Sequence, residues 1–182
     1  MQIDPDGLLQ DVRYTPSPNC DERPEGSSIG LLVIHNISLP PGEFGGPGII
    51  DLFTNRLDAA AHRHPYYREI AGLNVSAHFL IRRDGAIIQF VPCGQRAWHA
   101  GESNWRGHGR CNDFSIGVEL EGTDDQPFED AQYERLAELT RALKAKYPIA
   151  DIVGHSDIAP GRKTDPGPCF DWARYRELLG NP

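Results

Sequence analysis

The chain has 182 residues, which is enough for one well-buried core and too few for two domains of ordinary size, so we expect a single domain. Its formal net charge of -8 argues against a general nucleic-acid binder, because such proteins need a basic surface to neutralise phosphates. No run of 18 apolar residues occurs, and the N-terminus lacks the basic start and apolar stretch of a secretory signal, so we expect a cytoplasmic protein without a membrane segment.

The beginning of the chain predicts an arm, a strand and a loop. Residues 1–28 are rich in Pro, Asp, Ser and Gly, which predicts an arm lying over the surface of a core formed by residues 29–182. The apolar run 30–34 predicts a strand that ends at His35, before a loop rich in proline and glycine. A strand end holds its side chain on rigid backbone, so His35 suits a metal ligand or a catalytic base, although it also suits an ordinary strand end.

The middle of the chain predicts a helix, a loop and a β-hairpin. Apolar residues recur at helical spacing over residues 49–57, and the Ala- and His-containing stretch 58–67 that follows predicts a loop. Residues 77–91 contain two strand-like runs around Asp84 and Gly85, a dipeptide that favours the tight turn of a hairpin. The two runs are therefore expected to pair in antiparallel fashion.

The stretch 114–122 alternates between two sets of residues, which predicts a strand with two distinct faces. One face is expected to carry Phe114, Ile116, Val118 and Leu120. The other face is expected to carry Ser115, Gly117, Glu119 and Glu121. A functional site on this second face would include the Glu119 carboxylate.

The last third of the chain predicts two helices and another strand. Apolar residues recur every three or four positions from Asp130 to Tyr147, before a proline, so this stretch is the strongest predicted helix. Residues 151–155 predict a short strand ending in histidine, and a final helix is expected from an Asp171 N-cap to Gly180. Because a hairpin and crossover connections coexist, we predict an α/β fold with a central mixed β-sheet flanked by helices.

Three residues could form a zinc site. His35 and His155 each end a predicted strand, and Asp165 lies ten residues after His155 on a loop that could bend back towards it. Two imidazole nitrogens and one carboxylate oxygen suit zinc and leave the fourth tetrahedral position for water, which is the arrangement of a catalytic site. The alternative is that the same residues cap elements or form hydrogen bonds in the core.

Glu119 and Lys163 are the candidate catalytic groups. The Glu119 carboxylate could hold an attacking water molecule and pass its proton to a leaving amine. Lys163 lies two residues before Asp165 on an extended segment, so it could face the same side and stabilise an oxyanion. The alternatives are a solvated strand face, which Glu119 would share with Glu121, and a solvated loop lysine.

Several other residues are candidates for substrate contacts. His99 follows Trp98 in the segment RAWHAG, where tryptophan and glycine could wall a sugar or peptide pocket. His78 opens a hairpin strand, and both histidines could instead lie in the core. Arg106 and Arg110 could pair with substrate carboxylates, or equally with acidic side chains of the protein.

Other residues that could bind a metal have weaker support from the sequence. His62 and His64 form an H-x-H pair, which could be a second metal site but more often faces solvent in such a loop. The cysteines occur singly, without a C-x-x-C pair, at Cys20, Cys93, Cys111 and Cys169. This spacing predicts free thiols with structural roles, and neither a zinc knuckle nor a dense disulfide framework.

Several motifs, taken in order along the chain, resemble one family of bacterial enzymes. They include "LLVIHNISLPPGEFGG", "VSAHFLIRRDG", "RAWHAG", "CNDFSIGVELEGTD" and "GHSDIAPGRKTDPG". These segments resemble the cytoplasmic N-acetyl-anhydromuramyl-L-alanine amidases of cell-wall recycling, from about Val12 to the last predicted helix. The resemblance implies the fold shared with peptidoglycan-recognition proteins and T7-type lysozyme, and a single amidase domain over residues 1–182.

The resemblance also implies a zinc enzyme. The positions that match the family's zinc ligands are His35, His155 and Asp165. Glu119 matches the catalytic glutamate, and Lys163 matches the lysine that supports the transition state. The implied reaction cleaves the amide between the lactyl group of 1,6-anhydro-N-acetylmuramic acid and the L-alanine of the stem peptide. The implied partner is a small muropeptide, with no nucleic acid, membrane or obligate protein partner, and with an indirect effect on β-lactamase induction through recycled muropeptides.

The sequence also suggests substrate contacts and two alternative functions. The residues expected to contact the muropeptide are Asn36, His78, Trp98, His99 and Arg110. Asn74 stands where an arginine assists the stem peptide in relatives, which is a departure from the family.

A non-catalytic module of the same fold that binds muropeptide is one alternative, although it would be expected to lack a metal ligand. A ferrous oxygenase that uses His155 and Asp157 is another.

Overall fold

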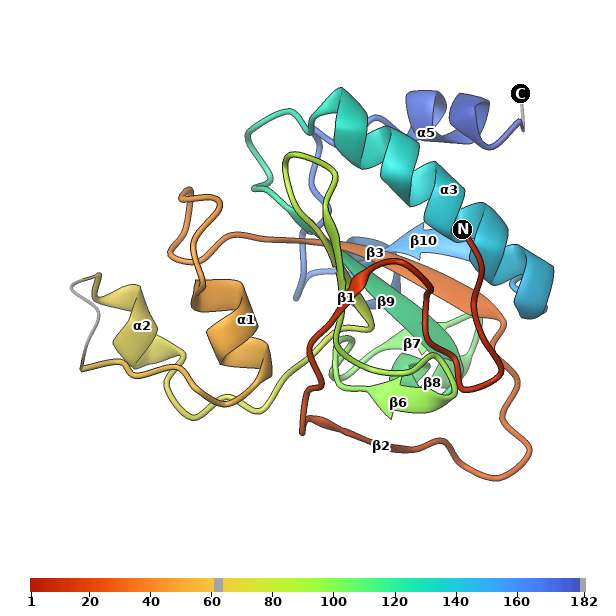
Figure 1. The fold of residues 1–182 in the computed structure, drawn as a ribbon, viewed down its shortest axis with the longest axis horizontal. Helices are drawn as coiled ribbons and strands as arrows, with labels where there is room; N and C mark the ends of the chain where they lie inside the picture. The colour runs from red at the N-terminus through yellow and green to blue at the C-terminus, as the bar shows by residue number, and fades with distance from the viewer. Residues whose placement is uncertain (61–63, 181–182) are drawn as a thin grey trace.

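The computed structural model describes residues 1–60 and 64–180, and its centre is a six-stranded mixed sheet (Figure 1). In sheet order the strands are β1 (Arg13–Tyr14), β5 (Ile87–Gln89), β4 (Phe79–Ile81), β9 (Ser115–Glu121), β3 (Leu31–Ile37) and β10 (Asp151–Gly154). Strands β4, β9, β3 and β10 are parallel to one another, β5 is antiparallel to β4, and β1 is parallel to β5. The predicted α/β class with a central mixed sheet is confirmed.

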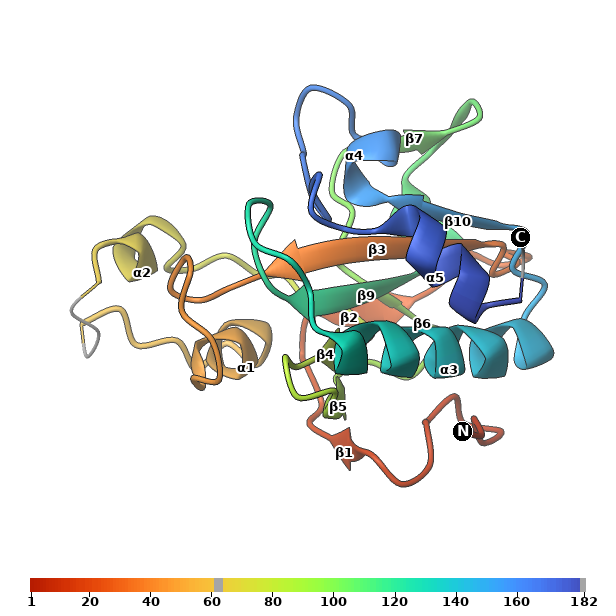
Figure 2. The ribbon, with the colours of Figure 1, turned by 90° about the horizontal axis from the view of Figure 1, so that it is seen from above.

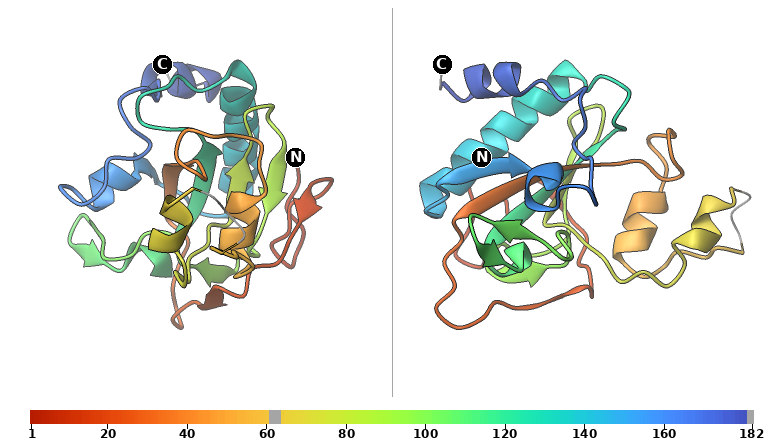
Figure 3. Two further views of the ribbon diagram at one scale, coloured as in Figure 1. Left: turned by 90° about the vertical axis from the view of Figure 1, so that its left-hand side faces the viewer. Right: turned by 180° about the vertical axis from the view of Figure 1, so that it is seen from behind.

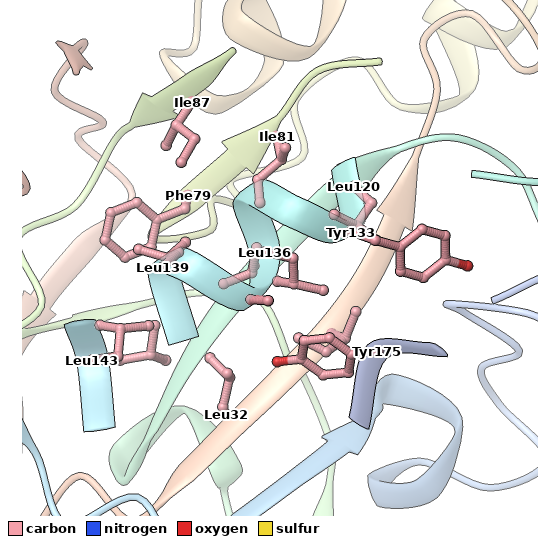
Figure 4. Packing of buried hydrophobic residues seen from close by; sticks show 14 of the residues in the cluster. Leu32, Phe79, Ile81, Ile87, Leu120, Tyr133, Leu136, Leu139, Leu143 and Tyr175 are labelled. Atoms are coloured by element: carbon pink, nitrogen blue, oxygen red, sulfur yellow. The ribbon is translucent and has the colours of Figure 1, made fainter. Parts of the chain in front are cut away.

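Two helices cover one face of the sheet (Figures 1 and 2), namely α3 (Asp130–Lys146) and α5 (Trp172–Leu178). Alternation along β9 points Ile116, Val118 and Leu120 at this face, where the apolar stripe of α3 meets them. Figure 4 shows this packing, which includes Leu32, Phe79, Ile81, Tyr133, Leu136, Leu139, Leu143 and Tyr175. Each fully buried leucine stabilises the fold by about 1.5–3 kcal/mol. The packing therefore holds β3 and β9 rigidly and leaves their other face for a site.

Short strands on the opposite face are drawn below the sheet in Figure 1, namely β2 (Cys20–Glu22), β6 (Gln95–Ala97), β7 (Asn104–Trp105) and β8 (His108–Gly109). A 3-10 turn (Cys111–Asp113) precedes β9, and α4 (His155–Ile158) follows β10 (Figure 2). Strand β2 pairs with β6, and β7 pairs with β8. Helices α1 (Gly48–Phe53) and α2 (Tyr66–Glu69) extend beyond the end of the sheet (Figure 3) and pack in a second apolar cluster, which also includes Leu80 of β4 and Ile88 of β5.

Three predicted elements form with small changes in their bounds. The hairpin is confirmed by the antiparallel pairing of β4 with β5, and its turn contains Gly85 at a φ of 83°. The long helix begins at Asp130 as predicted and ends at Lys146. The last helix begins after an Asp171 N-cap, whose carboxylate accepts a hydrogen bond from the Arg174 backbone amide at 2.9 Å. Local patterns were sufficient for these elements because their signals lie within a few residues.

The region after the first predicted helix differs from expectation. The helix predicted over residues 49–57 ends at Phe53, because Asn55 adopts the left-handed region with a φ of 56°. Helix α2 begins at the end of the stretch predicted as a loop, with Pro65 as its N-cap residue, and continues two residues beyond it. The prediction for His62 lies outside the described residues.

Two strand ends also differ from prediction. Strand β3 continues past His35 to Ile37, because β9 pairs with it as far as Glu121. Strand β10 ends at Gly154, and His155 instead opens α4. Both histidines nevertheless lie at the carboxyl ends of neighbouring parallel strands, which is where α/β proteins commonly bind ligands.

Two further segments pack differently from expectation. Phe114 packs against the cluster of Leu31 and Val33 on the site face rather than with Ile116, because its ψ of 15° interrupts the extended backbone before β9 begins. The arm formed by residues 1–28 contributes β1 and β2, which pair with β5 and β6. Within the described part of the chain, no helix combines the length and apolar character that crossing a membrane requires.

Candidate metal centre

Strand register brings three candidate residues level with one another. Gly154 of β10 pairs with Ile34 of β3, so His155, the next residue, lies level with His35. His35 pairs with Glu119 of β9, and paired residues on neighbouring strands point to the same face of a sheet. The two imidazoles and the carboxylate therefore meet on the face opposite to α3.

The donor atoms of His35, His155 and Asp165 face one another. The His35 Nδ1 atom lies 3.0 Å from His155 Nδ1 and 3.0 Å from Asp165 Oδ2, and His155 Nδ1 lies 3.0 Å from the same oxygen. A tetrahedral zinc ion about 2.0–2.1 Å from each donor separates neighbouring donors by roughly 3.3 Å. This donor triangle is therefore close to the size that one zinc ion requires.

The outer nitrogens of both histidines have partners that leave Nδ1 available to a metal. The His155 Nε2 atom lies 3.1 Å from the Ala100 carbonyl oxygen, which can only accept, so Nε2 carries a proton and donates to this oxygen. The His35 Nε2 atom lies 2.9 Å from His99 Nδ1. Burial lowers the pKa of His35 to about 4, so the His35 ring is neutral at pH 7. Unprotonated imidazole nitrogens beside a carboxylate are a zinc donor set, and the residues fit this metal.

Glu119 lies beside the donor triangle and is largely buried. The residue is 9% exposed, and its Oε2 atom is buried with no hydrogen-bond partner among residues 1–60 and 64–180. Burial and then the charge of Asp165 raise the pKa of this carboxyl well above its usual range, against the opposing effect of Lys163. The alternative of a solvated strand face is wrong, because Glu121 is also buried and pairs with Arg82.

One cavity of about 250 Å³ joins the candidate metal and catalytic residues. Its polar end is lined by His35, Asn36, His99, Glu119, His155, Lys163 and Asp165. Its apolar wall is lined by Leu52, Phe53, Ile70, Leu73, Val75 and Trp98. A concave site of this kind, with a few convergent polar groups beside apolar side chains, suits a small molecule that carries one reactive polar bond.

Comparison with known proteins identifies the family. Residues 25–168 match the family model described as N-acetylmuramoyl-L-alanine amidase. The chain belongs to this amidase family. It is 61% identical over 175 residues to the 1,6-anhydro-N-acetylmuramyl-L-alanine amidase AmpD of Salmonella typhimurium strain SL1344, a match that covers 95% of this chain and 92% of that protein. The resemblance inferred from the motifs is confirmed.

Solved structures of relatives share the fold of this amidase. A crystal structure of a selenomethionine derivative of AmpD matches with a TM-score of 0.95 and 59% identity, covering 98% of this chain and 99% of that chain. Escherichia coli AmiD, in complex with the substrate anhydro-N-acetylmuramic acid-L-Ala-D-γ-Glu-L-Lys, matches with a TM-score of 0.65 and 33% identity. That match covers 88% of this chain and 61% of the AmiD chain. The predicted amidase fold is confirmed.

Three of the predicted substrate contacts of this amidase line the cavity, namely Asn36, Trp98 and His99. The Asn36 amide also has protein partners, because its Nδ2 atom donates to Asp124 Oδ1 at 2.6 Å and to the Pro166 carbonyl at 3.0 Å. Asn36 therefore ties the loop that carries Asp165 to β3. A direct contact with substrate stays a prediction for all three residues.

The other two predicted contacts, His78 and Arg110, do not line this cavity. His78 is fully buried, and its Nδ1 atom accepts a hydrogen bond from a backbone amide of β9 at 3.0 Å. The Arg110 side chain is 74% exposed and pairs with Asp113 at 3.1 Å. Arg106 pairs with Asp151 at 3.0 Å. The structural ion pairs, which were the alternative for both arginines, are thus present.

Arg23 is a residue near the site that sequence reasoning missed. Its guanidinium donates to the carbonyl oxygens of Asn112 at 2.9 Å, Cys93 at 3.2 Å and Ser115 at 2.8 Å, which fastens the N-terminal arm against β9. Burial lowers the pKa of Arg23 to about 10. No local pattern could have revealed this role, because the three partners lie 70 to 92 positions away.

Proposed function

We propose that this chain is a zinc-dependent amidase that hydrolyses the amide between the lactyl group of 1,6-anhydro-N-acetylmuramic acid and the L-alanine of the stem peptide. The observation that carries the proposal is the donor triangle beside a buried glutamate in one cavity. AmpD is named for this reaction, and AmiD was solved with a substrate of this kind. The proposed zinc ligands are His35, His155 and Asp165.

Each group at the polar end of the cavity has a defined task in this proposal. A zinc ion held by the three donors would supply a Lewis acid that activates water and polarises the lactyl carbonyl group. Glu119 accepts a proton from the attacking water and returns it to the departing alanine nitrogen. Burial raises the pKa of Glu119, which makes its carboxylate a stronger base for this transfer. Lys163 stabilises the negative charge that develops on the carbonyl oxygen.

The apolar wall of the cavity would hold the rest of the muropeptide. Trp98 offers a broad apolar surface for a sugar ring or a stem-peptide side chain. Its ring is fixed in place, because the indole Nε1 donates to Asp21 Oδ1 at 3.2 Å. A rigid aromatic wall restricts the bound substrate and helps to keep its lactyl amide near Glu119.

The alternatives predicted from the sequence gain no support. A non-catalytic muropeptide-binding module is expected to lack a metal ligand, whereas this chain keeps all three beside Glu119 and Lys163. A ferrous oxygenase would need Asp157 as a ligand. Instead, the Asp157 Oδ2 atom accepts a hydrogen bond from the Gly154 backbone amide at 2.7 Å, at the beginning of α4.

The proposed place of this reaction is the cytoplasm. All four cysteines are free thiols, which supports a reducing compartment. The proposed partner is the small muropeptide itself, and an indirect effect on β-lactamase induction would follow from the level of recycled muropeptides.

Mass spectrometry of 1,6-anhydro-muropeptide incubated with the protein tests the proposed function. We expect free anhydro-N-acetylmuramic acid and free stem peptide, whose masses together exceed that of the substrate by one water molecule. Product formation should stop with a zinc chelator and return with added Zn²⁺, because the activating ion is removed and restored. Zinc-loaded protein that leaves the substrate intact would contradict the proposal, and iron content with oxygen uptake would favour the oxygenase.

Lys163→Met is expected to lower kcat roughly 100-fold, because methionine keeps the length of the side chain but removes the charge that stabilises the oxyanion. Zinc content should stay at the wild-type level, since Lys163 supplies no donor atom to the triangle. Steady-state kinetics on anhydro-muropeptide measure the effect. Lys144→Met, on an exposed position of α3, is the control for loss of a lysine charge. A Lys163 variant with wild-type kcat would remove this residue from the mechanism.

A further inference from the structure

Two consecutive residues contact the outer nitrogens of both histidines in the donor triangle. The His99 Nδ1 atom lies 2.9 Å from His35 Nε2, and the Ala100 carbonyl oxygen lies 3.1 Å from His155 Nε2. One short segment therefore supports two ligands that come from different elements, β3 and α4. A shift of residues 99–100 would disturb both imidazoles at once.

The direction of these hydrogen bonds follows from a requirement of metal binding: the nitrogen that binds the metal must carry no proton. His35 can offer Nδ1 to a metal only if its proton is on Nε2, so Nε2 donates to His99 Nδ1. His99 then carries its own proton on Nε2, which donates to Ser115 Oγ at 3.1 Å. All three residues are buried, which strengthens these bonds. The chain of hydrogen bonds fixes both the tautomer and the orientation of the His35 ring.

Strand β9 is shaped to receive the His99 ring. A Cβ atom at Gly117 would lie 2.5 Å from His99 Cγ, so the position beneath the ring accepts only glycine without a shift of the histidine. Ser115, Gly117 and Glu119 point to the same face of β9. One face of one strand thus supplies the acceptor for His99, the gap for its ring and the proposed catalytic carboxylate.

Asn112 holds residues 99–100 through their backbone amides. Its Oδ1 atom accepts hydrogen bonds from the backbone amides of His99 at 3.2 Å and Ala100 at 2.8 Å. The Ala100 carbonyl also accepts from Arg162 Nη2 at 2.7 Å. Residues 99–100 are therefore fixed by side chains as well as by the chain itself.

We propose that residues 99–100, held by Asn112, are a positioning support that orients both histidine ligands for zinc. His99 acts through His35 in this proposal and not by contact with the reacting atoms. The inference rests on the zinc site of the proposed function, but it makes a separate claim. The affinity for zinc should depend on the hydrogen-bond acceptor at the position of His99 Nδ1.

The dissociation constant for Zn²⁺, measured by competition with a chromophoric chelator, tests this claim. His99→Leu removes the acceptor and is expected to weaken binding about 10- to 100-fold. His99→Asn places an amide oxygen near the position of Nδ1 and should stay within about threefold of the wild-type affinity. The absorption bands of bound Co²⁺ should shift in the leucine variant and not in the asparagine variant. Equal weakening in both variants, or no weakening in either, would overturn the proposal.

A second pair of variants keeps the test decisive if His99→Leu does not fold. Asn112 is only partly buried, so Asn112→Ala should fold, and it is expected to weaken Zn²⁺ binding about 10-fold by releasing residues 99–100. Asn112→Asp keeps an oxygen acceptor and should bind Zn²⁺ like the wild type. Unfolding in urea without metal separates the alternatives: lower stability with a wild-type dissociation constant would show a merely structural role. A wild-type protein that binds no zinc would instead contradict the proposed function.

Discussion

Glu119→Gln is expected to lower kcat by about 100- to 10,000-fold while zinc stays bound. Glutamine keeps the shape of the side chain but cannot accept a proton from water or return one to the leaving nitrogen. Glu119 supplies no atom to the donor triangle, so the dissociation constant for Zn²⁺ should not change. Muropeptide turnover and elemental analysis measure the two quantities separately.

Glu121→Gln is the matched control for this variant. Glu121 lies two residues further along the same face of β9 and is also buried. Its carboxylate, unlike the Oε2 atom of Glu119, has partners: it pairs with Arg82 and accepts from the Gly45 backbone amide at 2.8 Å. The control should lower the free energy of unfolding by about 1–3 kcal/mol and keep turnover near the wild-type level. Wild-type turnover in Glu119→Gln would show that another group takes the proton.

Asp165→Asn is expected to weaken zinc binding by at least about 100-fold and to reduce turnover to background, because an amide lacks the negative charge that balances the ion. The Asp165 Oδ2 atom lies 3.0 Å from Nδ1 of both His35 and His155, so its loss opens the donor triangle. Zinc per chain after dialysis, and kcat at increasing Zn²⁺, are the measurements. High Zn²⁺ should restore part of the turnover if affinity alone is reduced.

Asp157→Asn provides the control for loss of a nearby carboxylate. An amide oxygen can still accept the hydrogen bond from Gly154 at the beginning of α4, so the fold and the zinc affinity should be preserved. The opposite pattern, with metal lost from Asp157→Asn and kept in Asp165→Asn, would assign the carboxylate ligand to Asp157. That result would revive the H-x-D arrangement of a ferrous enzyme.

The local patterns of the chain were a good guide to side-chain direction. Alternation over residues 114–122 correctly placed Glu119 on the face opposite to Ile116 and Val118, because a strand repeats every two residues. It could not distinguish Glu119 from Glu121, which share that face. The difference depends on Arg82, which comes from the end of the hairpin strand and lies 39 positions away from Glu121 in the chain.

The types of donor groups and the side-chain directions within each element follow from the amino-acid sequence, and the ordered motifs reveal the family. Which of these groups meet depends on the fold. His35 and His155 are 120 positions apart, and they converge because β3 pairs with β10 in a register that places Gly154 beside Ile34. Periodicity is a property of a few neighbouring residues, whereas register and the placement of Arg23 or Asn112 depend on the packing of the whole core.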